Sequence, residues 1–398
     1  MAYLTAQTEQ GNCRVLSVHD GVIECEPQLT EKVIREGNTN TWHLWHARIE
    51  GKKGEKVKIL LHWPKFDPEL VADEYKNAAN YDIGWESFVR PAQDAVFISS
   101  DRLTWTRIEE VSLDDHDLYW EVELPEDTCY FAVTLYYTPE MLKKLIKDLD
   151  GNPYVNYEII GNDYLGDDIH AFTVTDFSVP AEKKTGVFFT AAQHCSEFNG
   201  CHLCDFAMRY LSSDDARAKE LRQKYVYFFV PVASISAWRQ GLGVHPSGIN
   251  PNRDWINREL PSTKAIHNWI TTLNPVPAIL FDLHSGLSNY GDWVNCQGIG
   301  VFPDLPEDKV NEQKRFIDLV YENCDFLPTC RYWDQFGANP HCFDGYGYNY
   351  GQVECFEISM YAMYDRAAGR HFPIDQSKIK RFTNQLLETV DLFFNTKA

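Results

Sequence analysis

Short apolar runs alternate with helix-like stretches over residues 150–398, and this alternation restricts the fold more than any other feature of the sequence. The apolar runs are "YVNYEIIG" (154–161), "DIHAFTVTD" (168–176), "TGVFFTAAQH" (185–194), "YVYFFVPV" (225–232) and "PAILFDLH" (277–284). Helix-like stretches such as 201–211 and 215–225 separate them, and 375–395 has the apolar spacing of a long amphipathic helix. The pattern predicts an α/β domain with a mixed sheet that helices flank on both faces.

The first part of the chain has a different pattern. Residues 1–137 contain short aromatic or β-branched runs, among them "EKVKILLHW" and "LYWEVEL", which turn-rich segments such as "EGKKGEK" separate. Several short strands without long helical stretches between them predict an all-β sandwich. A helix is expected next in "TPEMLKKLIKDLDGNP", with Thr138 as its N-cap and Gly151 at its end. We therefore predict a β-sandwich domain over 1–150, ending in this linker helix, and an α/β domain over 151–398.

Composition and charge exclude several classes of protein. The 398 residues suffice for two domains, and 37 basic against 58 acidic residues give a net charge of −21, which disfavours binding to nucleic acid or to a membrane surface. No apolar stretch approaches the roughly 20 residues that cross a bilayer, and the first residues lack the pattern of a signal peptide. Eleven scattered cysteines are typical of reduced thiols in a core. These features together predict a cytoplasmic protein.

Two of the apolar runs end in a histidine. His194 follows one run and His284 completes another, and ligands of open α/β sheets bind beyond the carboxyl ends of the strands. Glu197 lies three residues after His194, close enough to share one ion. Two histidines and a glutamate form a known set of ligands for catalytic zinc. Taken alone, His194 and Glu197 would fit a plain surface turn; with His284 they predict a site for one Zn²⁺ ion, with Asp282 as a candidate partner of His284.

Five short motifs follow one another in an order that resembles the zinc carboxypeptidases. The motifs are "HCSE" (194–197), "AWR" (237–239), "NPNRDW" (250–255), "FDLHSG" (281–286) and "CFEIS" (355–359). The resemblance covers roughly residues 150–398. The β-rich start, with "CYFAVTLYYTPEMLKKLIKDL", is similar to the N-terminal domain of the cytosolic carboxypeptidase subgroup, in which a small β-sandwich precedes the catalytic domain.

The resemblance implies a role for each motif residue. His194, Glu197 and His284 would bind zinc; Glu357 would be the general base, and Arg239 would polarise the scissile carbonyl. The substrate's terminal carboxylate would bind to Asn252 and Arg253, since a guanidinium matches a carboxylate with two parallel hydrogen bonds. A mobile tyrosine is also expected, and Tyr348 is the nominal choice among Tyr332, Tyr346, Tyr348 and Tyr350. The chain would then hydrolyse the C-terminal peptide or isopeptide bond of a peptide or protein.

Some of these residues have competitors nearby. Asn257 and Arg258 repeat the "NR" pair, but they stand among helix-forming residues and are interpreted as a solvated face, whereas Arg253 follows a Gly/Pro-rich loop that is typical of a substrate-binding segment. Glu354 competes with Glu357, and residues three apart on a strand point to opposite faces. We interpret Cys201 and Cys204 as core residues, because no second pair at zinc-finger spacing accompanies them.

The sequence is less informative about the substrate's side chain. In the family the specificity position falls some fifteen residues before the catalytic glutamate, which is near Cys342, Phe343 and Asp344. The segment "HCFDGYGYNYGQ" has no Lys or Arg, so an apolar or aromatic terminal residue fits better than glutamate, unless Arg331, Arg366 or His341 supplies a positive charge.

Two other functions stay open at this point. A related zinc amidohydrolase or deacylase would use the same metal and base on acyl-amino acids or cell-wall peptides. A binding module would keep the metal site and lack turnover. The sequence gives no indication of the oligomeric state.

Overall fold

The computed structural model divides the chain into two compact units. One comprises Met1–Leu142, Ala237–His245 and Leu287–Gly291, and the other comprises Lys143–Ser236, Pro246–Gly286 and Asp292–Ala398. The predicted domain boundary near residue 150 stays a prediction. The structure describes residues 2–28, 45–62, 96–114, 117–195, 197–241, 245–285, 294–298, 306–325, 343, 354–360, 363–365, 370–372 and 375–396.

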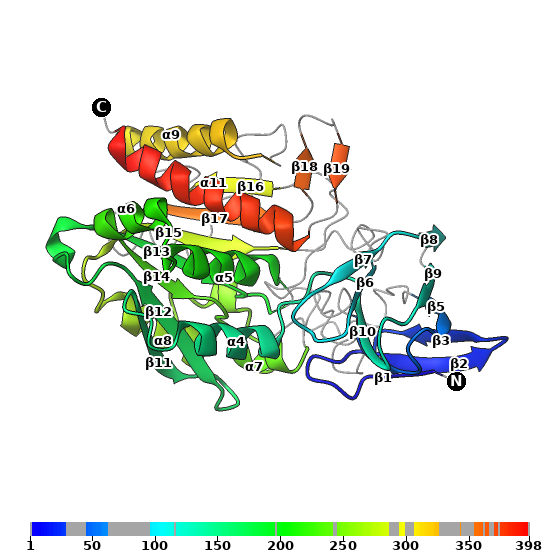
Figure 1. The fold of residues 1–398 in the computed structure, drawn as a ribbon. Helices are drawn as coiled ribbons and strands as arrows, with labels where there is room; N and C mark the ends of the chain where they lie inside the picture. Colours follow the sequence, from blue (N-terminus) through cyan, green and yellow to red (C-terminus); the bar gives the residue numbers. More distant parts are fainter. Residues whose placement is uncertain are drawn as a thin grey trace. The chain divides into compact units, whose positions relative to one another are not determined.

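The first unit contains two five-stranded sheets (Figure 1). In spatial order, one sheet consists of β1 (Tyr3–Thr5), β4 (His46–Glu50), β10 (Thr128–Ala132), β6 (Val96–Ser99) and β7 (Thr106–Ile108). The other consists of β2 (Arg14–His19), β3 (Val22–Glu26), β5 (Lys56–His62), β9 (Asp117–Glu123) and β8 (Val111–Asp114). All neighbours are antiparallel except β3 and β5.

The two sheets share one apolar core. Alternate residues of β5 are buried, which is the period of a strand with one face in the core. Ile59 and Trp120 of one sheet belong to the same buried cluster as Ile49 and Phe131 of the other. The ring of Trp120 lies edge-on to that of Phe131, with centroids 5.8 Å apart. The prediction of an all-β sandwich at the start of the chain is confirmed.

Helix α4 (Pro139–Leu149) occupies the stretch where the sequence predicts a helix. The Thr138 hydroxyl accepts a hydrogen bond from the Met141 amide at 3.3 Å, as an N-cap does. Gly151 has a φ of +72°, a left-handed conformation that ends helices and that glycine adopts without strain. Both predicted ends of this helix are confirmed.

The second unit is built on a mixed seven-stranded sheet. In spatial order the strands are β11 (Val155–Asn162), β12 (Asp168–Val174), β14 (Tyr225–Val230), β13 (Thr185–Ala191), β15 (Pro277–His284), β17 (Glu354–Met360) and β16 (Val294–Gly298). The central strands β14, β13, β15 and β17 run parallel, and the remaining pairs are antiparallel. A separate two-stranded pair joins β18 (Met363–Asp365) to β19 (Arg370–Phe372).

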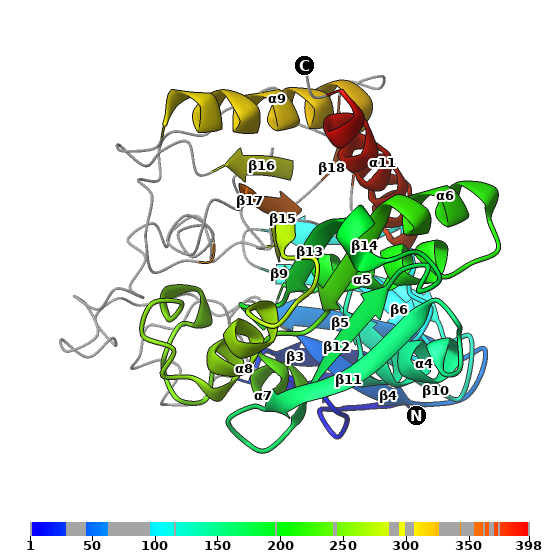
Figure 2. The ribbon, with the colours of Figure 1, turned by 90° about the vertical axis from the view of Figure 1, so that its left-hand side faces the viewer.

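Helices cover both faces of this sheet, as Figure 2 shows. Helices α5 (Asn199–Leu211), α6 (Ala216–Lys224) and α11 (Gln376–Asn395) lie on one face, and α8 (Pro261–Ile270) lies on the other beside β11. Helix α9 (Glu307–Asn323) packs against α11 and β16. Every residue of β14 is buried, which explains its continuous apolar sequence. The predicted α/β architecture is confirmed.

The described residues contain no helix that is both long and apolar enough to cross a membrane. Seven of the cysteines in the described ranges, Cys13, Cys25, Cys129, Cys195, Cys201, Cys204 and Cys324, are buried and free of disulfides. Cys201 and Cys204 lie in the buried part of α5, in agreement with their interpretation as core residues.

Candidate metal centre

The candidate metal centre lies at the carboxyl ends of two neighbouring parallel strands. Strand β13 ends at Ala191, which pairs with Leu283 of β15, so His284 ends its strand beside the segment that leads to His194. Between strand and ligand, Ala192 has a φ of +52°, which is unusual for a residue other than glycine. Two hydrogen bonds hold this turn: the Ala233 amide donates to Ala191 and the Ser234 amide donates to Ala192.

Glu197 joins the two histidines. Its Oε1 lies 2.9 Å from Nδ1 of His194, and its Oε2 lies 2.7 Å from Nδ1 of His284. The imidazole centroids are 5.0 Å apart, and one ligand atom from each residue lies within 4.8 Å of the other two. The exposed fraction of each side chain is small, 18% for His194, 9% for Glu197 and 4% for His284. The structure thus brings together the three residues that the sequence predicts as metal ligands.

The Glu197 side chain is held as an anion. Burial by itself raises the pKa of this carboxyl, but the charges of His194 and His284 and their hydrogen bonds outweigh burial and hold the pKa well below its usual range. The Ser285 amide adds a hydrogen bond of 3.0 Å to Oε2. Two imidazole nitrogens and a carboxylate within one buried space are a donor set that suits zinc.

Outer hydrogen bonds orient both imidazole rings. Asp282 Oδ2 lies 2.8 Å from Nε2 of His284, and Asn250 Oδ1 lies 3.2 Å from Nε2 of His194. Nδ1 of each ring faces the Glu197 carboxylate here; with a metal bound, the Asn250 oxygen and the Asp282 carboxylate would accept from the Nε2 protons and leave a lone pair on each Nδ1 for the metal. Asp282 therefore contacts His284 as its predicted partner, and Asn250 makes the equivalent contact with Nε2 of His194.

The proposed carboxylate-binding residues lie in the next loop, around the short helix η4 (Pro251–Arg253). Asn252 is buried, and its Oδ1 accepts from the Phe343 amide at 3.1 Å, which turns Nδ2 toward Nε2 of His284 at 3.2 Å. Arg253 is half-buried and donates to the Asn252 carbonyl at 2.8 Å. The structure thus places Asn252 against the metal centre and Arg253 next to it in the chain.

In the competing pair, Asn257 is exposed and Arg258 lies outside the helices of the structure. Arg258 is half-buried and donates to the Trp255 carbonyl at 2.9 Å. Its φ of +53° is incompatible with a helix.

The candidate general base lies on the neighbouring strand. Glu357 is in β17, where it pairs with Asp282 of β15 on one side and with Gln297 of β16 on the other. Glu354 begins the same strand and pairs with Ile279. Glu357 therefore lies one strand from the Asp282–His284 pair, and its role as a base stays a prediction.

Arg239 and the tyrosines complete the predicted set. Arg239 ends α7 (Ile235–Arg239) and belongs to the first unit, where its Nη2 donates to the Glu9 carboxylate at 2.9 Å. Its role at the scissile carbonyl stays a prediction. Tyr332, Tyr346, Tyr348 and Tyr350 lie outside the described residues, as do Arg331, Arg366 and His341.

Sequence reasoning missed two contributors to this site. Asn250 caps η4, with its Oδ1 accepting from the Asn252 amide at 2.9 Å while it also contacts His194. An Asn before a Pro is a signal for such a cap, and the motif contains it. Trp255 stands in the same motif, and its indole Nε1 donates to Gln193, the residue before His194, at 2.5 Å.

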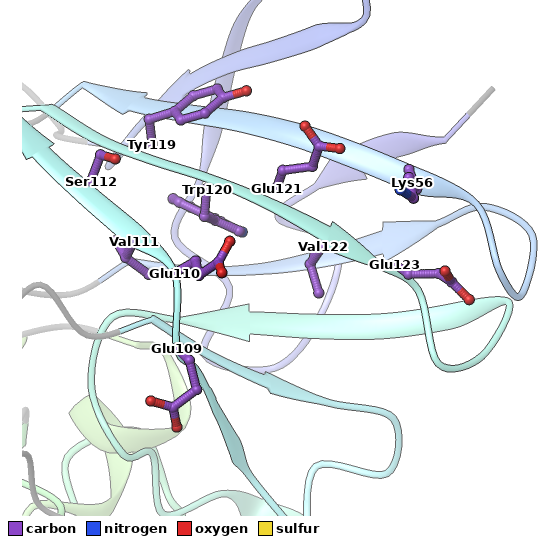
Figure 3. A pocket seen from close by; sticks show the side chains of 10 residues that line it. All are labelled: Lys56, Glu109, Glu110, Val111, Ser112, Tyr119, Trp120, Glu121, Val122 and Glu123. Carbon is purple, nitrogen blue, oxygen red and sulfur yellow. The ribbon is translucent and has the colours of Figure 1, made fainter.

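The first unit has an open groove over β8 and β9, with a volume of about 620 Å³. Figure 3 shows the residues that line it, with the carboxylates of Glu109, Glu121 and Glu123 directed away from one another. Separated, exposed carboxylates do not form a metal site. Over the described ranges, His194, Glu197 and His284 are the one set of three groups that could hold an ion.

Two family models match separate parts of the chain. The model for zinc carboxypeptidases matches residues 144–270, and the model for the N-terminal domain of cytosolic carboxypeptidases matches residues 4–134. The first match includes His194, Glu197, Asn252 and Arg253.

Curated relatives agree with these matches. Cytosolic carboxypeptidase 2 of Xenopus tropicalis is 28% identical over 169 residues, which are 39% of this chain and 16% of that protein. An uncharacterized protein of Zymomonas mobilis is 23% identical over 254 residues, or 63% of this chain and 59% of that protein. The chain thus spans less than two thirds of the length of these relatives.

Solved structures share the fold over its whole length. A metallo-carboxypeptidase from Burkholderia cenocepacia is similar over 100% of both chains, with a TM-score of 0.75 at 17% identity. A metallo-carboxypeptidase from Pseudomonas aeruginosa, in complex with (2-guanidinoethylmercapto)succinic acid, is similar over 99% of both chains, with a TM-score of 0.72 at 16% identity.

Proposed function

The chain belongs to the zinc carboxypeptidase family, and on this premise we propose that it is a zinc-dependent metallocarboxypeptidase that releases the C-terminal residue of a peptide or protein. One observation carries the proposal: the buried cluster of His194, Glu197 and His284 lies in contact with Asn252 of the loop expected to bind a carboxylate. The cytoplasm, which the names of related cytosolic carboxypeptidases indicate, is the proposed location.

Nδ1 of His194, Nδ1 of His284 and the carboxylate of Glu197 would hold one zinc ion. When bound, zinc acts as a Lewis acid that lowers the pKa of water and polarises a carbonyl oxygen. Asp282 and Asn250 would keep both imidazoles in the tautomer that leaves Nδ1 free. Burial around the cluster would exclude bulk water and strengthen each of these interactions.

Glu357 is the proposed general base. Its carboxylate would take a proton from the attacking water and return it to the leaving amine, so that the peptide C–N bond breaks and the amine leaves neutral. Its strand supports this role, because β17 adjoins β15 in register with Asp282. Arg239 would donate hydrogen bonds to the oxyanion that forms on the carbonyl, and Tyr348 would close over the substrate.

The loop that carries Asn252 and Arg253 would select free C-termini. A guanidinium and an amide N–H₂ group bind a carboxylate together, and a peptide amide in its place would leave these donors without an anion. Because the Asn252 amide also contacts His284, the bound carboxylate would lie about one residue from the metal centre. The bond cleaved would then be the last one in the chain, peptide or isopeptide.

The test combines metal analysis with hydrolysis. We expect one zinc per chain, loss of activity with a chelator, release of single residues from free C-termini, and near-complete loss of turnover in Glu357→Gln. Glu354→Gln, on the same strand, is the matched control and should stay active. Preferential hydrolysis of acyl-amino acids would instead indicate an amidohydrolase, and bound zinc without turnover on a broad peptide library would indicate a binding module.

A further inference from the structure

Gln193, the residue before His194, is a polar side chain in an apolar setting. It is 1% exposed, and its backbone oxygen accepts from the Ser234 hydroxyl at 2.7 Å. Its Oε1 accepts from the indole of Trp255, while Nε2 has no hydrogen-bond partner among the described residues. A buried amide with an unpaired N–H₂ group costs free energy that an apolar residue of similar size would avoid. The bond to Trp255 is therefore the feature that accounts for a glutamine here.

Trp255 is itself firmly placed. Its ring is fully buried and lies edge-on to Phe343, with centroids 4.5 Å apart. The preceding Asp254 accepts from the amides of Glu259 and Leu260, at 2.9 Å each, just before α8 begins. The Trp255 indole can thus transmit the position of the metal-binding segment to the loop that carries Asn252 and Arg253.

The same loop contacts the metal centre at two further points. Asn250 Oδ1 lies 3.2 Å from Nε2 of His194, and Asn252 Nδ2 lies 3.2 Å from Nε2 of His284. Two contacts alone would let the loop turn about the line that joins them. The Gln193–Trp255 hydrogen bond restrains that rotation, and a displacement of about 1 Å in a positioning group can change a rate about a hundredfold.

We propose that Gln193 and Trp255 are positioning residues that set the distance between the carboxylate-binding loop and the metal centre, and thereby restrict recognition to the free C-terminal carboxylate. The inference rests on the proposed function, because it takes Asn252 and Arg253 as the carboxylate-binding pair. It goes further in naming which contact fixes their position and in assigning a role to two residues that touch neither metal nor substrate.

Binding provides a test that does not depend on turnover. The zinc-loaded Glu357→Gln protein is titrated with a tripeptide that ends in phenylalanine and with its C-terminal amide, and calorimetry gives both dissociation constants. We expect the free acid to bind more tightly, and we expect this preference to fall about tenfold in Gln193→Met and in Trp255→Phe, with one zinc per chain retained. The double variant should lose no more of the preference for the free acid than either single variant, because each substitution removes the same Gln193–Trp255 hydrogen bond.

Trp269→Phe is the matched control. Trp269 is also buried and donates its indole N–H to Glu158 at 3.0 Å, but this bond lies between α8 and β11. Its loss should leave the preference for the free acid unchanged. An unchanged preference in both Gln193→Met and Trp255→Phe, or an equal fall in Trp269→Phe, would overturn the inference, as would equal binding of acid and amide by the protein with Gln193 and Trp255 intact. A clear preference without any hydrolysis by the unsubstituted chain would refute only the proposed activity.

Discussion

Asp282 offers a sharp test of how the metal centre is held. Its carboxylate is almost fully buried and accepts from Nε2 of His284 at 2.8 Å. Asp282→Asn keeps an acceptor of the same shape and removes the charge. A hydrogen bond to a charged group contributes about 1.5–3 kcal/mol and a neutral one about 0.5–1.5 kcal/mol, so the change should cost about 1.4 kcal/mol. That cost corresponds to a roughly tenfold weaker affinity for zinc.

Asp282→Leu goes further, because it leaves the Nε2 proton of His284 without an acceptor. The affinity for zinc should then fall about a hundredfold, which is the upper end of the range measured when such hydrogen-bond partners of metal ligands are removed. Competition with a chromophoric chelator measures both affinities. Asp391→Asn is the control, a change of the same kind at a buried aspartate of α11 that contacts Arg217 and Lys224. Zinc affinity within twofold of wild type in both Asp282 variants would refute this reading of the site.

Three further predictions concern stability. Burial raises the pKa of Asp391, but its hydrogen bonds to Arg217 and Tyr225 outweigh burial and lower the pKa to about 2, so Asp391→Asn should lower the free energy of unfolding by about 2 kcal/mol at pH 7. Because the pKa is depressed in the folded protein, the difference in stability between wild type and variant should shrink as the pH falls from about 4 to 2. Urea unfolding across this pH range measures the difference. Ala192→Val should lower the free energy of unfolding by about 2 kcal/mol, since a β-branched side chain at a φ of +52° is strained; unchanged denaturant midpoints would contradict this. Thr138→Ala should cost about 1 kcal/mol through the lost cap of α4, and thermal unfolding would show no shift if the cap were unimportant.

The elements of the second unit could be predicted because their signals are local. Long apolar runs such as 225–230 are buried on both faces, and amphipathic stretches such as 375–395 have one apolar side, so strand and helix follow from periodicity alone. The histidines could be assigned to strand ends for the same reason. The side-by-side pairing of β13 and β15 could not be read from the sequence, because β14 lies between them in the chain and the order of strands depends on long-range packing.

The contacts within the site were harder to predict. Arg258 stands among helix-forming residues, yet the chain has a left-handed conformation at this residue that local propensity does not reveal. Asn250 and Trp255 stand inside a motif that the sequence displays, yet their partners, His194 and Gln193, are more than fifty residues away. Such long-range side-chain pairs depend on tertiary structure and leave no periodic pattern.

Cys195 provides the most direct test of the metal centre, because it lies between two proposed ligands and thiolate sulfur is a common ligand for zinc. Burial raises the pKa of its thiol, and the ligand atoms that converge among the described residues belong to His194, Glu197 and His284 and do not include its sulfur. X-ray absorption at the zinc edge of the purified protein separates sulfur, at about 2.3 Å, from nitrogen and oxygen, at about 2.0–2.2 Å. The account predicts one zinc per chain with imidazole and carboxylate ligands only. A sulfur neighbour, or a protein that binds no zinc, would contradict it.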